Sequence, residues 1–184
     1  MSEDLTTHMR PSATDNRSDR RLTWLLGGAT AGMGLLSGLF YGYACSVMPG
    51  LAKSDDRTLV DAMQQINKAI ENPVFFATFV GAPALALGAL VIERRWTSRE
   101  ALRWIALALV LAGIDFAITG GINIPLNDDL AAAGDPARIS DLAGVRDHFE
   151  GTWVVWNIVR TVATTASFGA LGRALWIHAR RSGR

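Results

Sequence analysis

The stretch RDHFEGTWVVWNIVRTVAT, residues 146–164, decides the fold. It places polar and aromatic side chains at steps of four and three, which at about 100° per residue keeps them within roughly 80° of one helix face. The residues of this stripe are Arg146, Glu150, Trp153, Asn157, Arg160 and Thr164. The apolar run continues to Ile177, so Arg160 lies about two turns inside a helix long enough to span a membrane. Because a charge at that depth is costly, the stripe indicates an interior polar site.

Four apolar runs of this kind occur in the 184 residues, of which 49% are hydrophobic. A hydrocarbon core about 30 Å thick needs roughly 20 residues of helix, and each run supplies about that length. The runs cover residues 22–47, 74–92, 102–124 and 153–177. The sequence therefore predicts an all-α protein, a four-transmembrane-helix bundle with both termini on one side of the membrane.

Lysine and arginine are distributed unevenly between the two sides of this bundle. Twelve lie in residues 10–21, 94–103 and 173–184, whereas five lie in the loops 48–73 and 125–152. Cytoplasmic flanks are enriched in these residues, so we expect a multi-pass protein of the cell membrane, surrounded by lipid, with both termini cytoplasmic. Topology explains the basic residues, and the net charge of +1 gives no reason to expect nucleic acid as a partner.

The chain divides into one domain and two short tails. Residues 1–21 are polar and lack apolar periodicity, which predicts a disordered cytoplasmic tail. The membrane domain is expected over residues 22–178, and a basic cytoplasmic tail over residues 179–184. In the first extracytoplasmic loop, apolar residues recur at helical spacing between Asp55 and Glu71, which predicts an amphipathic helix over the outer end of the bundle, as an interfacial element or a lid.

Two further features concern packing inside the membrane. Asp115 and Arg160 lie at matching depths in the third and fourth runs, and an isolated charge there is expensive, so we expect them to form a buried ion pair. Gly34, Gly38 and Gly42 form a small-residue groove on the first run, which serves either packing within the bundle or an oligomer interface.

Several short motifs have an order and spacing that resemble the anthrone oxygenase-like family of small four-helix membrane proteins. They are Met48-Pro49-Gly50-Leu51, Met63-Gln64 with Asn67, Ile70 and Pro73, Asn123-x-Pro125-x-Asn127, and Arg146 to Arg160 with Phe149, Trp153 and Asn157 between them. The resemblance covers roughly residues 25–172. It implies oxidation of a polyketide anthrone to an anthraquinone with dioxygen, without a metal or organic cofactor. The implied partners are a small hydrophobic aromatic substrate and dioxygen.

Oxidation of an anthrone needs a base for its acidic methylene, a donor for the resulting oxyanion, and room for oxygen. The base is expected to be His148 or Glu150, with Arg160 and Asn157 completing the catalytic set. Substrate-binding positions are expected at Tyr41, Asn67, Asn123, Asn127, Arg146, Trp153 and Trp156. No metal site is expected, because Cys45, Met48, His148 and Glu150 lack ligand spacing.

Simpler interpretations remain open at this point. Asp115 and Arg160 could serve only to fix helix register, and His148 could be an ordinary exposed histidine. A second function from another class is a non-catalytic membrane protein that binds or passes a small hydrophobic or quinone-like ligand through the same cavity.

Overall fold

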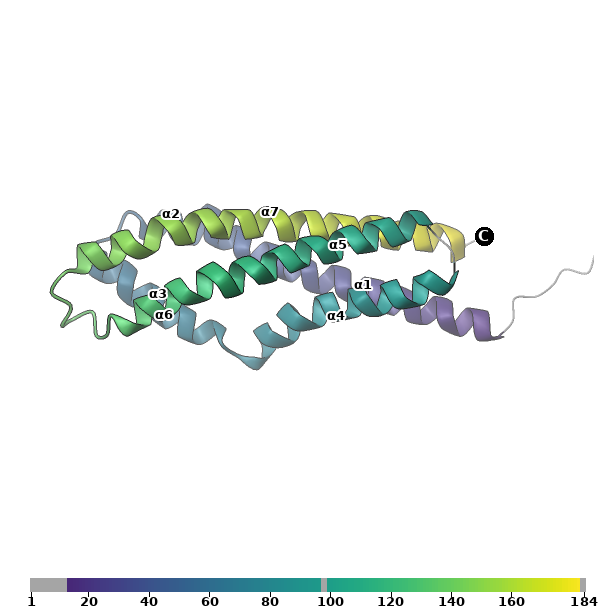
Figure 1. Cartoon of the computed structure of the whole chain (residues 1–184), viewed down its shortest axis with the longest axis horizontal. Coiled ribbons are helices and arrows are strands. Elements are labelled where there is room, and N and C mark those ends of the chain that lie inside the picture. The colour runs from purple at the N-terminus through teal and green to yellow at the C-terminus, as the bar shows by residue number, and fades with distance from the viewer. Residues whose placement is uncertain (1–12, 97–98, 183–184) are drawn as a thin grey trace, which may run out of the picture.

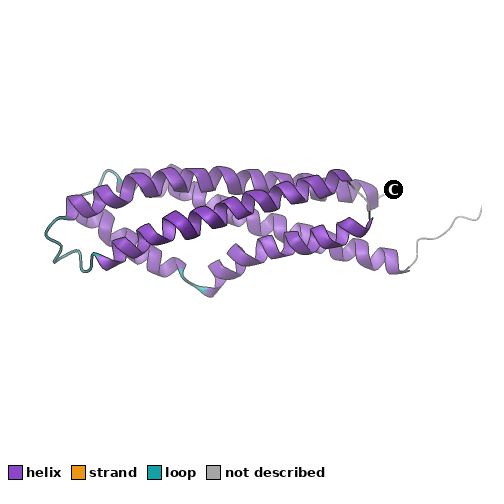
Figure 2. Cartoon of the chain, viewed as in Figure 1, coloured by secondary structure: helices purple, strands orange, loops and turns teal. Residues whose placement is uncertain are grey.

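The computed structural model describes residues 13–96 and 99–182, and every element in these residues is helical (Figure 2). Helix α1 (Ala13–Gly42) continues through a π-helical segment, η1 (Tyr43–Val47), into α2 (Met48–Leu51). Helix α3 (Asp56–Ile70) is followed by α4 (Pro73–Trp96). Helix α5 (Arg99–Ile118) continues through a second π-helical segment, η2 (Thr119–Asn123), into α6 (Ile124–Ala132), and α7 (Leu142–Ser182) ends the described chain.

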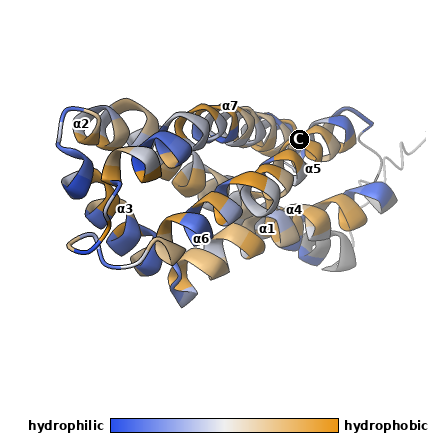
Figure 3. Ribbon diagram, turned by 60° about the vertical axis from the view of Figure 1, so that its left-hand side comes forward, coloured by the Kyte–Doolittle hydropathy of each residue, from blue (hydrophilic) through white to orange (hydrophobic). Residues whose placement is uncertain are grey.

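The helices form an elongated bundle in which α7 packs along α5 and α1, and α1 packs along α4 (Figure 1). Helices α3 and α6 and the loop before α7 lie together at the end farthest from the C-terminus. The long helices carry most of the hydrophobic residues, and hydrophilic ones gather at this end and at the opposite end of the bundle (Figure 3). We call the end that carries α3 and α6 the loop end.

The bundle has an apolar surface, and part of its interior is polar. In the middle of α7, Asn157, Arg160, Thr164 and Ser167 are buried. Large apolar residues are exposed instead, on α7 and on the other long helices, including Val80, Leu87, Val110, Ile114, Val155 and Val162. Such a surface suits lipid, where polar groups must find partners inside the protein.

Three helical stretches are long and apolar enough to cross a membrane, as judged over the described residues. They are Asp19–Leu51, Pro73–Arg94 and Arg99–Ala132, and they indicate a membrane protein. The fourth predicted span lies within α7, which does not reach the same hydropathy because its buried stripe is polar. The all-α fold class is thus confirmed, with three clear candidate spans.

Two proline residues explain the π-helical segments. The ring of a helical proline clashes with the carbonyl four residues earlier. Pro49 and Pro125 would therefore clash with Cys45 and Gly121, and both of these residues lie inside the wider π-helical turns. The third apolar run was predicted to end at Ile124, but its helix continues to Ala132, with Pro125 in the first turn of α6.

Other boundaries also differ from the expected ones. Helix α1 begins at Ala13, so residues 13–21 are helical, although the sequence analysis assigned them to a disordered tail. Hydrogen bonds fix this end of α1 in place. Thr23 donates to Asp19 O within the helix, and its hydroxyl contacts Nε2 of His178 on α7 at 2.9 Å. The remainder of that predicted tail, residues 1–12, lies outside the described residues.

The loop helix predicted over residues 55–71 is present as α3. Asp55 caps it by accepting a hydrogen bond from Thr58 N at 3.0 Å, and this bond holds the pKa of Asp55 below its ordinary value. Leu59, Val60 and Met63 are buried against α6 and α7. Helix α3 therefore covers the loop end of the bundle.

The glycines of the first span differ in their surroundings. A side chain at Gly34 would contact Phe168 of α7 at 3.1 Å, and one at Gly32 would meet Ala82 of α4 at 2.8 Å. Gly38 and Gly42 have open space beside them. Gly34 therefore serves packing inside the bundle, while an oligomer through this face stays a prediction.

Candidate functional site

A cavity of about 140 Å³ lies at the loop end, where α1, α3, α4, α6 and α7 converge. Helix α3 covers it through Ile66, Asn67 and Ile70. Its wall combines apolar and aromatic side chains with a set of polar residues drawn from five elements. The polar set is Tyr43, Asn67, Glu71, Thr119, Asn123, Asn127, Asn157 and Arg160.

Aromatic rings form much of the cavity wall. Phe75 and Phe79 of α4 stack with ring centroids 5.3 Å apart, and Phe79 stacks in turn on Phe116 at 4.2 Å. On another side, the rings of Tyr43 and Trp153 lie 5.7 Å apart. Flat rings of this kind suit a flat apolar ligand, since aromatic pairs favour stacked and tilted contacts at these distances.

Arg160 is buried in the cavity wall and held on three sides. Its Nη1 donates to Thr119 Oγ1 at 3.2 Å, and its Nη2 donates to Asn157 Oδ1 at 3.1 Å. The guanidinium carbon lies 4.4 Å from the centroid of the Phe40 ring, a cation–π contact. Asn157 Nδ2 donates in turn to Phe40 O at 3.1 Å, so α7 and α1 together fix the position of this charge.

Asn123 and Asn127 meet Trp153 across the cavity wall. Trp153 Nε1 donates to Asn127 Oδ1 at 2.9 Å, and Asn123 Nδ2 donates to Trp153 O at 3.4 Å. Because the carbonyl of Trp153 can only accept, the amide nitrogen of Asn123 has to face it, and this leaves Asn123 Oδ1 turned elsewhere.

Three buried side-chain atoms of the described residues have no hydrogen-bond partner within the protein. They are Asn67 Nδ2, Asn123 Oδ1 and Arg160 Nε, and all three belong to residues that line this cavity. Buried polar atoms are normally paired, and each orphan costs free energy. Two unpaired donors and one unpaired acceptor therefore belong to residues of one aromatic cavity.

The predicted ion pair between Asp115 and Arg160 is indirect. No direct contact joins them; Thr119 lies between them, and its hydroxyl donates to Asp115 Oδ1 at 3.4 Å while it accepts from Arg160 Nη1. Side chains on a helix tilt toward its N-terminus. Helices α5 and α7 are antiparallel, so two residues at equal depth point away from each other along the bundle axis, and Thr119 fills the gap.

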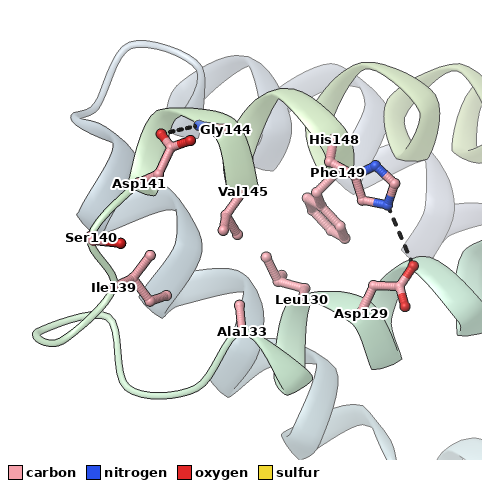
Figure 4. A pocket seen from close by; sticks show the side chains of 10 residues that line it. All are labelled: Asp129, Leu130, Ala133, Ile139, Ser140, Asp141, Gly144, Val145, His148 and Phe149. Atoms are coloured by element: carbon pink, nitrogen blue, oxygen red, sulfur yellow. Dashed lines mark hydrogen bonds and ion pairs between the residues drawn. The ribbon is translucent and has the colours of Figure 1, made fainter.

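The two predicted bases lie outside the cavity. His148 is 67% exposed in its side chain and faces Asp129, with Nε2 3.4 Å from Oδ2 (Figure 4). This pair borders a surface depression at the loop end that Ile139, Asp141 and Phe149 also line. Glu150 accepts a hydrogen bond from Arg146 Nε at 2.6 Å. Both residues lie nearer the start of α7 than the cavity does.

Arg146, predicted to bind substrate, anchors the first loop instead. Its Nη1 donates to Ser54 O and Asp56 Oδ1, both at 3.0 Å, and its Nη2 donates to Ala52 O at 3.1 Å. The hydrogen bond to Glu150 raises the pKa of Arg146 above its ordinary value. These contacts join α7 to the residues that precede α3.

Tyr41 and Trp156 were also predicted to line the site, and neither does. Tyr41 is 60% exposed, and Trp156 is half-buried; neither is among the residues that line the cavity. Tyr43, two residues after Tyr41 and at the start of η1, lines the cavity instead. Among the described residues, no group of three His, Cys, Asp or Glu side chains could hold a metal ion.

Sequence reasoning missed the aromatic wall. Phe40, Phe75 and Phe79 are apolar residues inside apolar spans, so nothing in the sequence separates them from lipid-facing residues. Thr119 was detectable, because it continues the stripe formed by Asp115 and Asn123 at spacing four.

No curated protein and no solved structure matches the chain. The model of the anthrone oxygenase family matches residues 69–170, more than half of the chain. This segment includes α5, η2 and α6 and the part of α7 that lines the cavity, with Asn123, Asn127, Trp153, Asn157 and Arg160. The resemblance inferred from the sequence motifs is therefore confirmed, and the chain belongs to the anthrone oxygenase family.

Proposed function

We propose that the protein is a cofactor-independent membrane oxygenase, which oxidises an anthrone-like polyketide to a quinone with dioxygen. Membership of the family supports the reaction class. The observation that carries the proposal is that the three unpartnered buried polar atoms all belong to residues of one aromatic cavity. A flat aromatic ligand with oxygen substituents would supply the partners that these atoms lack.

The reaction assigns a clear task to Arg160. Loss of a proton from the methylene of an anthrone gives a carbanion whose charge is delocalised onto the carbonyl oxygen. Arg160 is a fixed donor in an apolar site, so it stabilises that developing oxyanion strongly. The delocalised carbanion then reacts with dioxygen, and the methylene becomes a carbonyl while the second oxygen atom leaves as water.

The arrangement in the membrane is part of the same proposal. Helix α7 is the fourth span, because its polar stripe is buried against α1 and α5 while exposed Val155, Val162 and Phe168 face outward. Both termini are then cytoplasmic, as the positions of lysine and arginine predict. The cavity lies in the outer half of the membrane, beneath α3 at the interface.

Oxygen consumption by the purified protein tests the proposed function. With anthrone itself as substrate, the wild-type protein in lipid nanodiscs should consume oxygen faster than empty nanodiscs. Arg160→Met should lower the rate at least about 10²-fold, the loss typical of an oxyanion donor. Asn123→Leu removes an unpaired acceptor instead, so it should raise KM for the substrate. Thr164→Val is the matched control, because Thr164 is buried one turn further along the same face of α7 but does not line the cavity.

Two results would contradict the proposal. Wild-type protein that binds anthrone without consuming oxygen would indicate a binding or transport protein instead. Equal rates in Arg160→Met and Thr164→Val would remove Arg160 from the reaction.

A further inference from the structure

The proposed reaction requires a group that accepts a proton from the methylene of the substrate. His148 and Glu150 lie outside the cavity and have other partners. Glu71 is the carboxylate that lines the cavity directly, but it is exposed at the end of α3 and also borders a groove on the surface. A second carboxylate, Asp115, lies just behind the cavity wall.

Asp115 is 1% exposed and does not itself line the cavity, but it contacts Thr119. Thr119 lines the cavity, and its hydroxyl contacts Asp115 Oδ1 at 3.4 Å and Arg160 Nη1 at 3.2 Å. One hydroxyl group thus joins the buried carboxylate, the buried guanidinium and the chamber where the ligand would lie.

The hydrogen bond of Thr119 differs from that of most helical threonines in the described residues. A hydroxyl inside a helix ordinarily donates to the carbonyl four residues earlier. Threonines that follow this rule occur in α1, α4 and α7, and they are Thr23, Thr30, Thr78, Thr161, Thr164 and Thr165. Thr58 donates to the carboxylate of Asp55, but that pair is exposed at the start of α3. Thr119 donates instead to the carboxylate of Asp115. Its proton is therefore already directed at a base.

We propose that Thr119 and Asp115 form the proton relay of the reaction, an inference that rests on the proposed function. The Thr119 oxygen takes a proton from the methylene of the substrate while its own hydroxyl proton passes to the carboxylate of Asp115. A C–H bond and an O–H bond break, two O–H bonds form, and Thr119 ends neutral. Thr119 is the catalytic residue, and Asp115 acts through it.

Charge balance supports this assignment. Before the transfer, the buried positive charge of Arg160 is balanced by ionised Asp115; afterwards it is balanced by the substrate oxyanion. The site therefore holds one positive and one negative charge throughout, which avoids the large cost of an unpaired buried charge. A relay to exposed Glu71 would instead leave both ionised Asp115 and the substrate oxyanion at the site, two negative charges against one positive charge.

The same relay completes the oxidation. The carbanion combines with dioxygen to give a peroxide anion, which takes back the proton from Asp115 through Thr119. The second methylene proton then leaves by the same path as the O–O bond breaks, and the departing hydroxide takes that proton to become water. The methylene carbon loses four electrons to dioxygen, and Asp115 ends ionised again.

Exchange of the methylene hydrogens for deuterium, measured without oxygen in heavy water, isolates the proton step. Anthrone with wild-type protein in nanodiscs should exchange faster than with empty nanodiscs. Thr119→Val keeps the shape but removes the hydroxyl, so exchange and kcat should fall about 10²- to 10⁴-fold with little change in KM. Thr119→Ser restores the hydroxyl and should recover most of the rate.

Asp115→Asn should resemble Thr119→Val, and the double variant should be no slower than either, because the two groups act as one unit. Thr164→Val again serves as the control for loss of a buried hydroxyl. Folded yield is measured for every variant, and Thr119→Val tests the relay even if Asp115→Asn does not fold.

Different failures point to different conclusions. Wild-type exchange in Thr119→Val, or loss of exchange in Glu71→Gln but not in Thr119→Val, would overturn the relay while the oxygenase function stands. If the wild-type protein neither exchanges nor oxidises anthrone, the proposed function fails and the relay fails with it.

Discussion

The side chain of Asn157 makes two hydrogen bonds, one to α1 and one to Arg160. Its amide nitrogen donates to Phe40 O on α1, and its oxygen accepts from Arg160 Nη2. It therefore joins two helices and orients the guanidinium in the cavity wall. At this scale, the orientation of the Arg160 guanidinium depends on the position of one amide.

We expect Asn157→Leu to fold and insert but to lose anthrone oxidation. The variant leaves Arg160 without one of its partners, which should cost about 1 to 3 kcal/mol of stability as well as the orientation of the donor. Thermal unfolding and oxygen consumption on the same preparation check this expectation. Full activity would mean that Asn157 serves only in helix packing.

Arg146→Met provides the contrast, since Arg146 binds the first loop and lies outside the cavity. This variant should unfold at a lower temperature because three groups before and within α3 lose their donor. Its oxygen consumption per folded molecule should stay within a few-fold of wild type below that temperature. A specific loss of activity would place Arg146 in the reaction after all.

At the scale of the elements, the stability of the start of α3 depends on pH. The bond from Thr58 lowers the pKa of Asp55, so the ionised carboxylate stabilises the helix above the unfolded pKa, about 3.9, and this contribution is lost as pH falls through the lower folded value. Asp55→Ala should reduce the amide exchange protection of α3 at pH 6 to 7. The difference from wild type should shrink at acid pH, and a constant difference would contradict the role of the charge.

The second π-helical segment sets the positions of Thr119 and Asn123, and Pro125 sets that segment. Pro125→Ala removes the ring and supplies an N–H, so the helix can become regular. A π-helical turn contains one residue more than an α-helical turn, so its conversion to α-helix rotates α5 by about 100° relative to α6. We expect normal helix content by circular dichroism with a large loss of activity; unchanged activity would show that the segment does not position the cavity residues.

The sequence predicted the positions of the helices better than the contacts between them, for physical reasons. Long apolar runs located the helices, because length and hydropathy are properties of a segment alone. The stripe of α7 identified Trp153, Asn157 and Arg160, because helical periodicity keeps them on one face. The partners of these residues depend on how helices tilt against each other, so the sequence analysis missed Thr119 between Asp115 and Arg160 and chose Tyr41 in place of Tyr43.

At the scale of the whole molecule, the orientation in the membrane is a prediction from charge. Reporter fusions after residue 98 and at the C-terminus should report the cytoplasm, and a fusion near Gly134 should report the outside. An exterior C-terminus would reverse the bundle and place the cavity in the inner half of the membrane. The same experiment decides whether α7 crosses the membrane, since three spans would put the two termini on opposite sides.

One wall of the cavity faces water. Asn67, Glu71 and Asn127 line both the cavity and a groove of about 650 Å³ on the surface of the loop end. In the proposed reaction each turnover leaves one molecule of water inside an apolar chamber, where it would compete with the next substrate for Arg160 and Asn123. A single layer of polar side chains gives that by-product an exit to the aqueous phase, so the chamber can be cleared after every cycle without carrying water through the bilayer.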